Sequence, residues 1–292
     1  MIADPNAVNR KVRRRQMINA GWRYVLLIAT AIIMLYPILW LFGASFKSNA
    51  EIFSTIWFWP SHWDFSSYIN GWKTGTEYTF GHYFINSMEI VLPKVFFTVI
   101  SCTLTAYGFT RFNFPFKKAM FSMLIATMFL PQVVSRIPLY IMFRNFGMLD
   151  TYVPLVANTV LAQEPFFVFM MIQFMRGIPR ELDEAATMDG CSSFGILMRV
   201  IAPMMRPAIM TVILFQFIWT MNDFLTPLIY ISSVSKFPVA IALKMSSDAA
   251  SGFVPWNQVI SMSLIALLPS MILFFSASRT FVDGMSAGSI KG

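Results

Sequence analysis

The sequence predicts an all-α membrane protein with six transmembrane helices, and three observations support this fold class. Hydrophobic residues make up 57% of the 292 residues and charged residues only 12%, about half the charged share of a soluble domain. Six apolar runs are long enough to cross about 30 Å of hydrocarbon as helices. No run alternates polar and apolar residues as the strands of a membrane barrel do. Lipid must therefore be the solvent for much of the chain.

The six apolar runs are spread along the whole chain. They cover residues 24–46, 84–109, 119–143, 153–175, 208–231 and 259–282. Several contain proline, at which we expect the helices to kink. No internal repeat or linker interrupts the pattern, so a single transmembrane domain over 1–292 is expected. The net charge of +8 comes from basic residues between the runs, which is typical of topology signals and does not indicate nucleic-acid binding.

The basic residues also predict the orientation of the chain. Fifteen of the 22 lysines and arginines fall in residues 1–23, in the segments after the second and fourth runs, and at Arg279 and Lys291 near the C-terminal end. Six spans place both termini on one side, and the positive-inside rule assigns that side to the cytoplasm. We therefore expect a multi-pass protein of a bacterial or archaeal cytoplasmic membrane. Its cytoplasmic parts would be 1–23, the loop 176–207 and the tail 284–292.

The loop 176–207 carries the most specific local signals. Acidic residues follow Pro179, as is typical of a first helical turn, and Gly190 can adopt a positive φ and end that helix. Ser192 or Ser193 can cap a second short helix, which prolines end before the fifth run. The residues alone predict two short helices along the membrane, joined at a glycine.

The same loop carries a resemblance to a known family. Its pattern consists of Glu184-Ala185-Ala186, Asp189-Gly190, Pro203 and Pro207. It closely resembles the EAA loop of binding-protein-dependent ABC importer permeases, in the maltose-type carbohydrate branch. Further agreement runs along residues 20 to 292, as in Ser45-Phe46-Lys47, Arg111-Phe112, Gly147-Met148-Leu149-Asp150-Thr151-Tyr152, Asn222-Asp223-Phe224 and Gly284-Met285-Ser286-Ala287-Gly288. Departures are mild: Cys191 stands where the family often has Ala, and Met221 where it often has Trp.

The resemblance implies a transport subunit rather than an enzyme. Two homologous permeases would form the sugar pathway in the lipid membrane, two ATPase subunits would bind ATP and Mg, and an extracytoplasmic solute-binding protein would deliver the sugar. The sequence agrees on one point, because it holds no G-x-x-x-x-G-K-[ST] motif for binding ATP, so no cofactor is expected on this chain. The implied ATPase-coupling residues are Glu184, Ala185, Ala186, Asp189 and Gly190.

The tail is also implied to touch the ATPases. Its glycines suggest a narrow, flexible strand suited to threading between two subunits. The residues implied in that contact are Gly288, Lys291 and Gly292.

Polar residues inside the apolar runs are candidates for the substrate pathway. They are Gln163, Glu164, Trp219, Asn222 and Asp223. The last three fall at i, i+3 and i+4, so one helix face would carry them all. The alternative is that Asp223 only ties its helix to a neighbour. In the second run, Lys94 is expected to snorkel to the membrane surface.

Other functions stay open. One alternative is an ABC permease for a non-sugar or acidic-saccharide solute. A proton-coupled secondary carrier would use Glu164 or Asp223 as its proton site, but a carrier has no use for a coupling loop. A membrane-embedded enzyme is disfavoured because no nucleophile set and no metal-ligand cluster stands out around His62 or His82. We therefore expect no metal site and no catalytic residues.

Overall fold

The computed structural model describes residues 5–73, 77–248 and 254–289, and side chains within 21–278 of that part. Every regular element in these residues is helical, and the predicted all-α class is confirmed. Contacts divide the chain into two compact units, residues 1–71 with 253–264 and residues 72–252 with 265–292.

The first unit is built on a long apolar helix. It contains α1 (Pro5–Ala44), α2 (Asn49–Ser54), α3 (Ser66–Trp72) and the start of α15 (Trp256–Ser289). The backbone carbonyl of Ser45, just past α1, accepts hydrogen bonds from the hydroxyls of Ser67 (2.6 Å) and Ser261 (3.0 Å). All three serines are buried, so these bonds satisfy polar groups that would otherwise be costly to bury.

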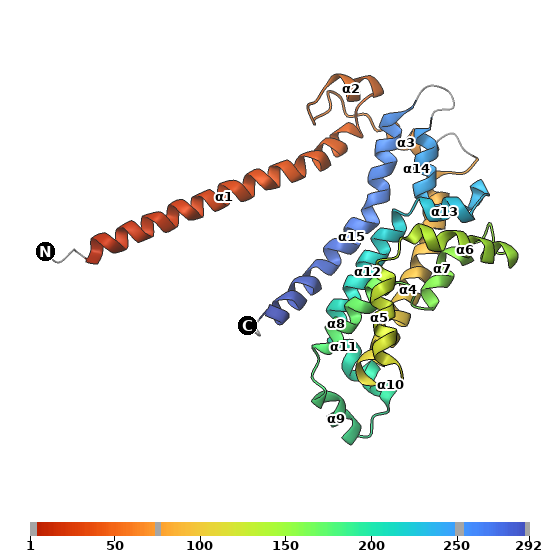
Figure 1. Cartoon of the computed structure of the whole chain (residues 1–292). Helices are drawn as coiled ribbons and strands as arrows, with labels where there is room; N and C mark the ends of the chain where they lie inside the picture. Colours follow the sequence, from red (N-terminus) through yellow and green to blue (C-terminus); the bar gives the residue numbers. More distant parts are fainter. Residues whose placement is uncertain (1–4, 74–76, 249–253, 290–292) are drawn as a thin grey trace. The chain divides into compact units, whose positions relative to one another are not determined.

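The second unit holds the remaining helices. They are α4 (Phe80–Arg111), α5 (Lys117–Met128), α6 (Gln132–Asn145), α7 (Val153–Val160), α8 (Pro165–Arg176), α9 (Glu181–Met188), α10 (Ser193–Ile196), η1 (Leu197–Ile201), α11 (Ala202–Met204), α12 (Arg206–Met221), α13 (Leu225–Tyr230), η2 (Val234–Lys236) and α14 (Val239–Ser247). Helix α4 packs against α7, α8, α12 and α14 and is the centre of the unit. Figure 1 shows α9 and α10 at one end of this unit and α13 and α14 at the other.

The core of the second unit lies between α4, α8 and the segment that leads into α12. Phe167 and Met171 of α8 and Val212 of α12 are fully buried there, together with Cys102 and Ala106 of α4. The small residues on α4 leave room for the larger side chains of its neighbours, as is usual where membrane helices approach closely.

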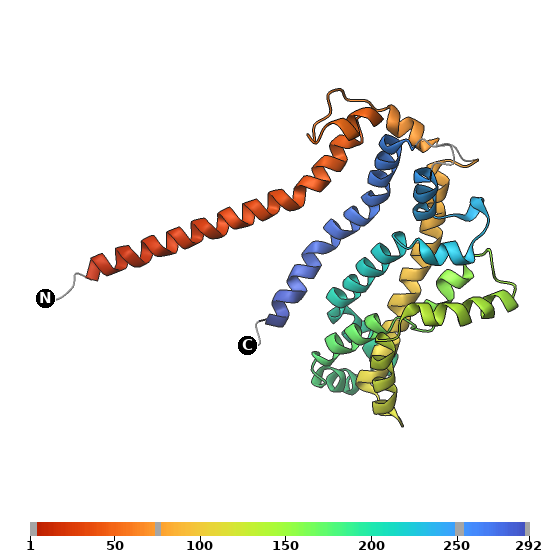
Figure 2. The same cartoon turned by 45° about the horizontal axis from the view of Figure 1, so that its top comes forward.

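Four helical segments in the described residues are long and apolar enough to cross a membrane, one of them made of α7 and α8. They are Gly21–Ala44, Phe80–Arg111, Val153–Arg176 and Trp256–Ser278. Two bent pairs raise the number to six if each pair is one span. In the first pair, α5 and α6 meet at 101° around Pro131, and Figures 1 and 2 show α6 turning sideways away from the end of α5. The second pair, Ser193–Met204 with Arg206–Met221, is bent by 77°.

The expectation of one continuous helix over 208–231 is wrong. Helix α12 ends at Met221, and α13 starts only at Leu225. The Asn222 side chain donates to the carbonyl of Ile218 (2.8 Å), and the Asp223 carboxylate accepts from the backbone N–H of Thr226 (3.1 Å). Such local side-chain bonds offer the backbone an alternative to the helical pattern.

The tail also differs from expectation. Helix α15 continues through Gly284 and Gly288 to Ser289, so these residues do not form an extended strand. The intervening Met285, Ser286 and Ala287 tolerate a helix, and no proline interrupts it. Lys291 and Gly292 lie outside the described residues.

Candidate coupling site and pathway

The loop between α8 and α12 folds as an elbow of two short helices. After α9, Gly190 has φ +80°, and its N–H donates to the carbonyl of Thr187 (3.0 Å). The N–H of Cys191 donates to the carbonyl of Ala186 (2.9 Å). These two bonds and the left-handed glycine form a Schellman motif. The Ser192 hydroxyl then caps α10 by accepting from the N–H of Gly195 (3.2 Å), so the predicted turn and cap are confirmed.

Helix α9 has an inner and an outer face. Ala186 is buried in the core of the second unit, and Asp183 is half-buried on the same side. Glu184 and Ala185 are exposed, as are Asp189 and Gly190 at the helix end. The exposed side of the elbow is thus available to a partner protein, whereas the small Ala186 lets α9 approach its own core closely.

Two residues that the sequence analysis did not assign to the site hold α9 in place. The guanidinium of Arg111, at the end of α4, lies 2.6 Å from the carboxylate of Asp183. The two residues are far apart in sequence and sit in different elements. In the sequence, Arg111 appears only as a basic residue after an apolar run, and Asp183 only as an acid in a first helical turn. Neither pattern predicts that the two residues pair.

The structure separates the predicted pathway residues into two groups. Trp219 of α12 packs its ring against Phe166 and Phe167 at the start of α8, with centroids 5.6 Å and 5.0 Å apart. Asp223, beyond the end of α12, instead lines a small cavity between α4, α7, α12 and α13. The expectation that one helix face carries Trp219, Asn222 and Asp223 is therefore wrong, because the helix ends at Met221.

The cavity is lined by two charged side chains from different segments, Lys94 and Asp223. Lys94 of α4 lines it with Asp223, Ser87 and Thr220. Glu164, at the break between α7 and α8, interacts electrostatically with both Lys94 and Asp223. The cavity encloses about 10 Å³, roughly the space for one water. Lys94 thus faces polar groups within the second unit. A lysine inside an apolar run is the sequence pattern that marks it as a candidate functional residue.

The other predicted pathway residues differ in exposure. Gln163 and Asn222 are exposed, and Glu164 is half-buried. Of the described residues, no three His, Cys, Asp or Glu side chains are grouped so as to hold a metal ion.

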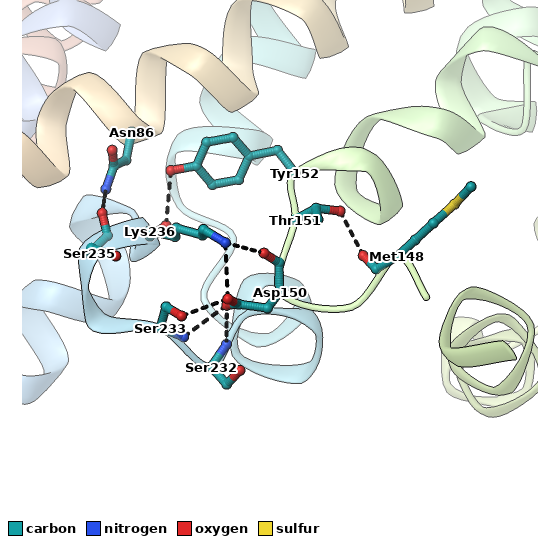
Figure 3. Close-up of polar contacts among 9 residues, drawn as sticks. All are labelled: Asn86, Met148, Asp150, Thr151, Tyr152, Ser232, Ser233, Ser235 and Lys236. Carbon is teal, nitrogen blue, oxygen red and sulfur yellow. Dashed lines mark hydrogen bonds and ion pairs between the residues drawn. The ribbon is translucent and has the colours of Figure 1, made fainter. Parts of the chain in front are cut away.

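At the end of the second unit away from α9, Asp150 organises a polar cluster (Figure 3). One carboxylate oxygen accepts from the backbone N–H groups of Ser232 (3.0 Å) and Ser233 (2.9 Å). The other accepts from the Ser233 hydroxyl (2.6 Å) and the Lys236 ammonium (3.0 Å). These bonds, led by those from Ser233, hold the pKa of Asp150 well below its usual range. The cluster fixes the segment after α13 to the loop before α7.

The segment 231–239 is also tied to α4. The amide of Asn86 donates to the carbonyls of Ser235 (2.8 Å) and Phe237 (3.0 Å). The phenol of Tyr152 donates to the carbonyl of Lys236 (3.2 Å), and burial raises the pKa of Tyr152 to about 12. Helix α4 and the loop before α7 therefore both hold this short segment of backbone.

Comparison with known proteins gives consistent matches. A family described as "Binding-protein-dependent transport system inner membrane component" matches residues 98–285. The Probable ABC transporter permease protein YurM of Bacillus subtilis is 30% identical, over 98% of this chain and 93% of its own length. The Diacetylchitobiose uptake system permease protein NgcG of Streptomyces coelicolor is 27% identical, over 93% of this chain and 89% of its own.

The fold also matches a solved structure. That structure is a bacterial ABC transporter involved in the import of the acidic polysaccharide alginate. It has a TM-score of 0.79 and 22% sequence identity, and the match covers 92% of this chain and 98% of the other. The similarity in fold thus extends over nearly the whole chain.

Proposed function

Because the chain belongs to the family of binding-protein-dependent transport system inner membrane components, we propose that it is the transmembrane permease subunit of an ATP-driven importer of sugars or oligosaccharides. The family inferred from the loop 176–207 is confirmed, and so is the role of transport subunit rather than enzyme. The chain is a multi-pass membrane protein. As one permease domain, it would form half of the pathway.

The observation that carries the proposal is the α9–Gly190–α10 elbow. Glu184, Asp189 and Gly190 are exposed on it, and the Schellman motif holds the angle between the two helices. A short helix with an exposed acidic face, anchored on its other side, suits a lever that sits in a cleft of an ATPase. Closure of the ATPases on ATP would displace the lever and bias the bundle between two arrangements.

The partners follow from this role. We expect a homologous second permease, two ATPase subunits that bind ATP and Mg, and an extracytoplasmic solute-binding protein. A solved complex of the alginate transporter contains a periplasmic protein bound to an alginate pentasaccharide, which supports the last partner. Both termini would lie in the cytoplasm, as the basic residues favour. Gly288, Lys291 and Gly292 would touch the ATPases.

The proposed substrate class rests on the relatives. The names of NgcG, the arabinooligosaccharide permease AraQ and the galactooligosaccharide permease GanQ each refer to an oligosaccharide. Gln163, Glu164, Asn222 and Asp223 would supply polar partners for sugar hydroxyls. The ring of Trp219 would offer an apolar wall for the C–H faces of the sugar.

Two experiments test the proposal. The tagged chain is co-expressed with its neighbouring subunits and purified, and the ATPase subunits should be retained. Glu184→Lys should release them, whereas the exposed Asp248→Lys should not. The solute-binding protein is then tested by calorimetry against neutral di- and trisaccharides and a uronate trisaccharide. Binding only of the uronate would shift the substrate to acidic saccharides, and binding of none would overturn the sugar class.

A further inference from the structure

The ion pair between Arg111 and Asp183 is largely shielded from water. Its side chains are only 7% and 17% exposed, and Arg111 Nε lies 2.6 Å from Asp183 Oδ2. Arg111 is the last residue of α4, and Asp183 lies in the first turn of α9. The pair therefore joins a membrane-spanning helix to the elbow.

Two further bonds cross the same junction in opposite directions. The guanidinium of Arg111 donates to the carbonyl of Ile178 (3.1 Å), just before α9. The guanidinium of Arg180 donates to the carbonyl of Thr110 (2.8 Å), next to Arg111. Because each arginine comes from one side and bonds to backbone on the other, the end of α4 and the start of α9 are fixed against sliding and rotation.

A third connection reaches the second arm of the elbow. The phenol of Tyr107, one turn before Arg111 on α4, donates to the carbonyl of Ser193 at the start of α10 (2.9 Å). Ala186 of α9 packs into the same buried cluster as Tyr107. Both arms of the elbow are thus fixed to the last turn of α4.

Helix α4 extends from this junction to the other end of the unit. It packs along α7, α8 and α12, and at its far end Asn86 holds η2 and the residue that follows it. A displacement of the elbow would therefore reach the segment around Asp150 through one continuous helix.

We infer that Arg111 and Asp183 are positioning residues that form the joint between the coupling elbow and α4. The inference rests on the proposed function. The joint transmits the movement of α9 because a buried ion pair cannot separate without leaving an uncompensated charge. Apolar contacts alone are less directional than the bonds of Arg111 and Arg180 to backbone carbonyls and would let α9 slide. Opening of the joint would leave the ATPases bound to the exposed face of α9 but uncoupled from the membrane helices.

The test uses the assembled transporter with both permeases, the ATPases and the loaded binding protein in proteoliposomes. Uptake of the radiolabelled sugar that binds tightest in the calorimetric panel is measured together with ATP hydrolysis. Asp183→Asn, which keeps the size and removes the charge, should lower sugar taken up per ATP by about tenfold. The ATPases should stay bound and active. The control is Asp248→Asn, which breaks the surface ion pair between Lys244 (54% exposed) and Asp248 (61% exposed). It should leave the amount of sugar taken up per ATP unchanged.

A second variant covers the case in which Asp183→Asn does not assemble. Arg111→Cys with Asp183→Cys, in a chain with Cys102 and Cys191 replaced by Ser, is joined by a short bifunctional thiosulfonate. The crosslinked complex should regain coupling and lose it when a reductant cleaves the link. The inference would be contradicted if Asp183→Asn left the sugar taken up per ATP unchanged. It would also be contradicted if the sugar taken up per ATP were the same with and without the crosslink. Failure of the wild-type complex to transport would overturn the proposed function instead.

Discussion

Lys236 lies 86 residues after Asp150, and its ammonium donates to both the backbone carbonyl (2.6 Å) and the carboxylate (3.0 Å) of that residue. The same carboxylate accepts three bonds from Ser232 and Ser233. Asp150 itself has φ +56°, a conformation that Asp and Asn tolerate better than other non-glycine residues. A strained loop residue thus fixes the segment that follows α13.

Loss of the Asp150 charge should weaken this part of the molecule. Asp150→Asn keeps a residue that tolerates a positive φ. It removes the negative charge, so the hydrogen bonds to the side chain become weaker and Lys236 loses its ion-pair partner. We expect the free energy of unfolding to fall by about 1–2 kcal/mol. Thermal unfolding in detergent measures the change. Asp248→Asn, in a pair that is more than half exposed, should change it by less than about 0.5 kcal/mol.

The stabilisation by Asp150 should depend on pH with a definite sign. Its pKa is lower in the folded chain than in the unfolded chain because Ser233 and Lys236 stabilise the carboxylate. The contribution is therefore fully present above the unfolded value of about 3.9 and is lost as the pH falls toward the folded value. The difference in melting temperature between wild type and Asp150→Asn should be constant from pH 8 to 5 and shrink below pH 4. A difference that grows on acidification would contradict this assignment.

The sequence predicts local features of this protein better than long-range ones. Gly190 and Ser192 could be assigned to a helix stop and a cap because both roles depend on neighbouring backbone. The break after Met221 was missed because an apolar run shows its length but not where Asn222 and Asp223 turn their side chains onto the backbone. The pairing of Arg111 with Asp183 and the meeting of Lys94 and Asp223 at one cavity depend on the packing of distant helices, which no local pattern contains.

The elbow should depend on the conformation of Gly190. A Cβ at this position would meet no atom within 4 Å, so a substitution acts through the backbone alone. Gly190→Val should cost at least about 1–2 kcal/mol in the left-handed region and misplace α10. We expect an inserted protein whose complex hydrolyses ATP without uptake or fails to hold its ATPases.

Asparagine provides the matched comparison at the same position. Gly190→Asn adds a side chain of similar size but tolerates positive φ, so it should retain more than half of the wild-type uptake. Uptake at the wild-type level in Gly190→Val would show that the angle of the elbow does not matter.

The pathway assignment predicts a pattern of chemical accessibility. In a chain with Cys102 and Cys191 replaced, single cysteines at Trp219 and Asn222, which are exposed, should react with a water-soluble thiol reagent. Cysteine at the fully buried Val212 of the same helix should not. Addition of ATP and loaded binding protein should change the reaction rate at 219 and 222. Protection of both positions in every state would place them against protein or lipid.

The most direct measurement is ATP-dependent sugar accumulation in proteoliposomes that contain the chain, the partner permease and the ATPases, with the binding protein on the opposite side from ATP. We predict accumulation that requires ATP, the binding protein and this chain, and that a protonophore does not abolish. Accumulation that persists without ATP and collapses with the protonophore would identify a proton-coupled carrier and contradict the account. So would undiminished accumulation when this chain is omitted.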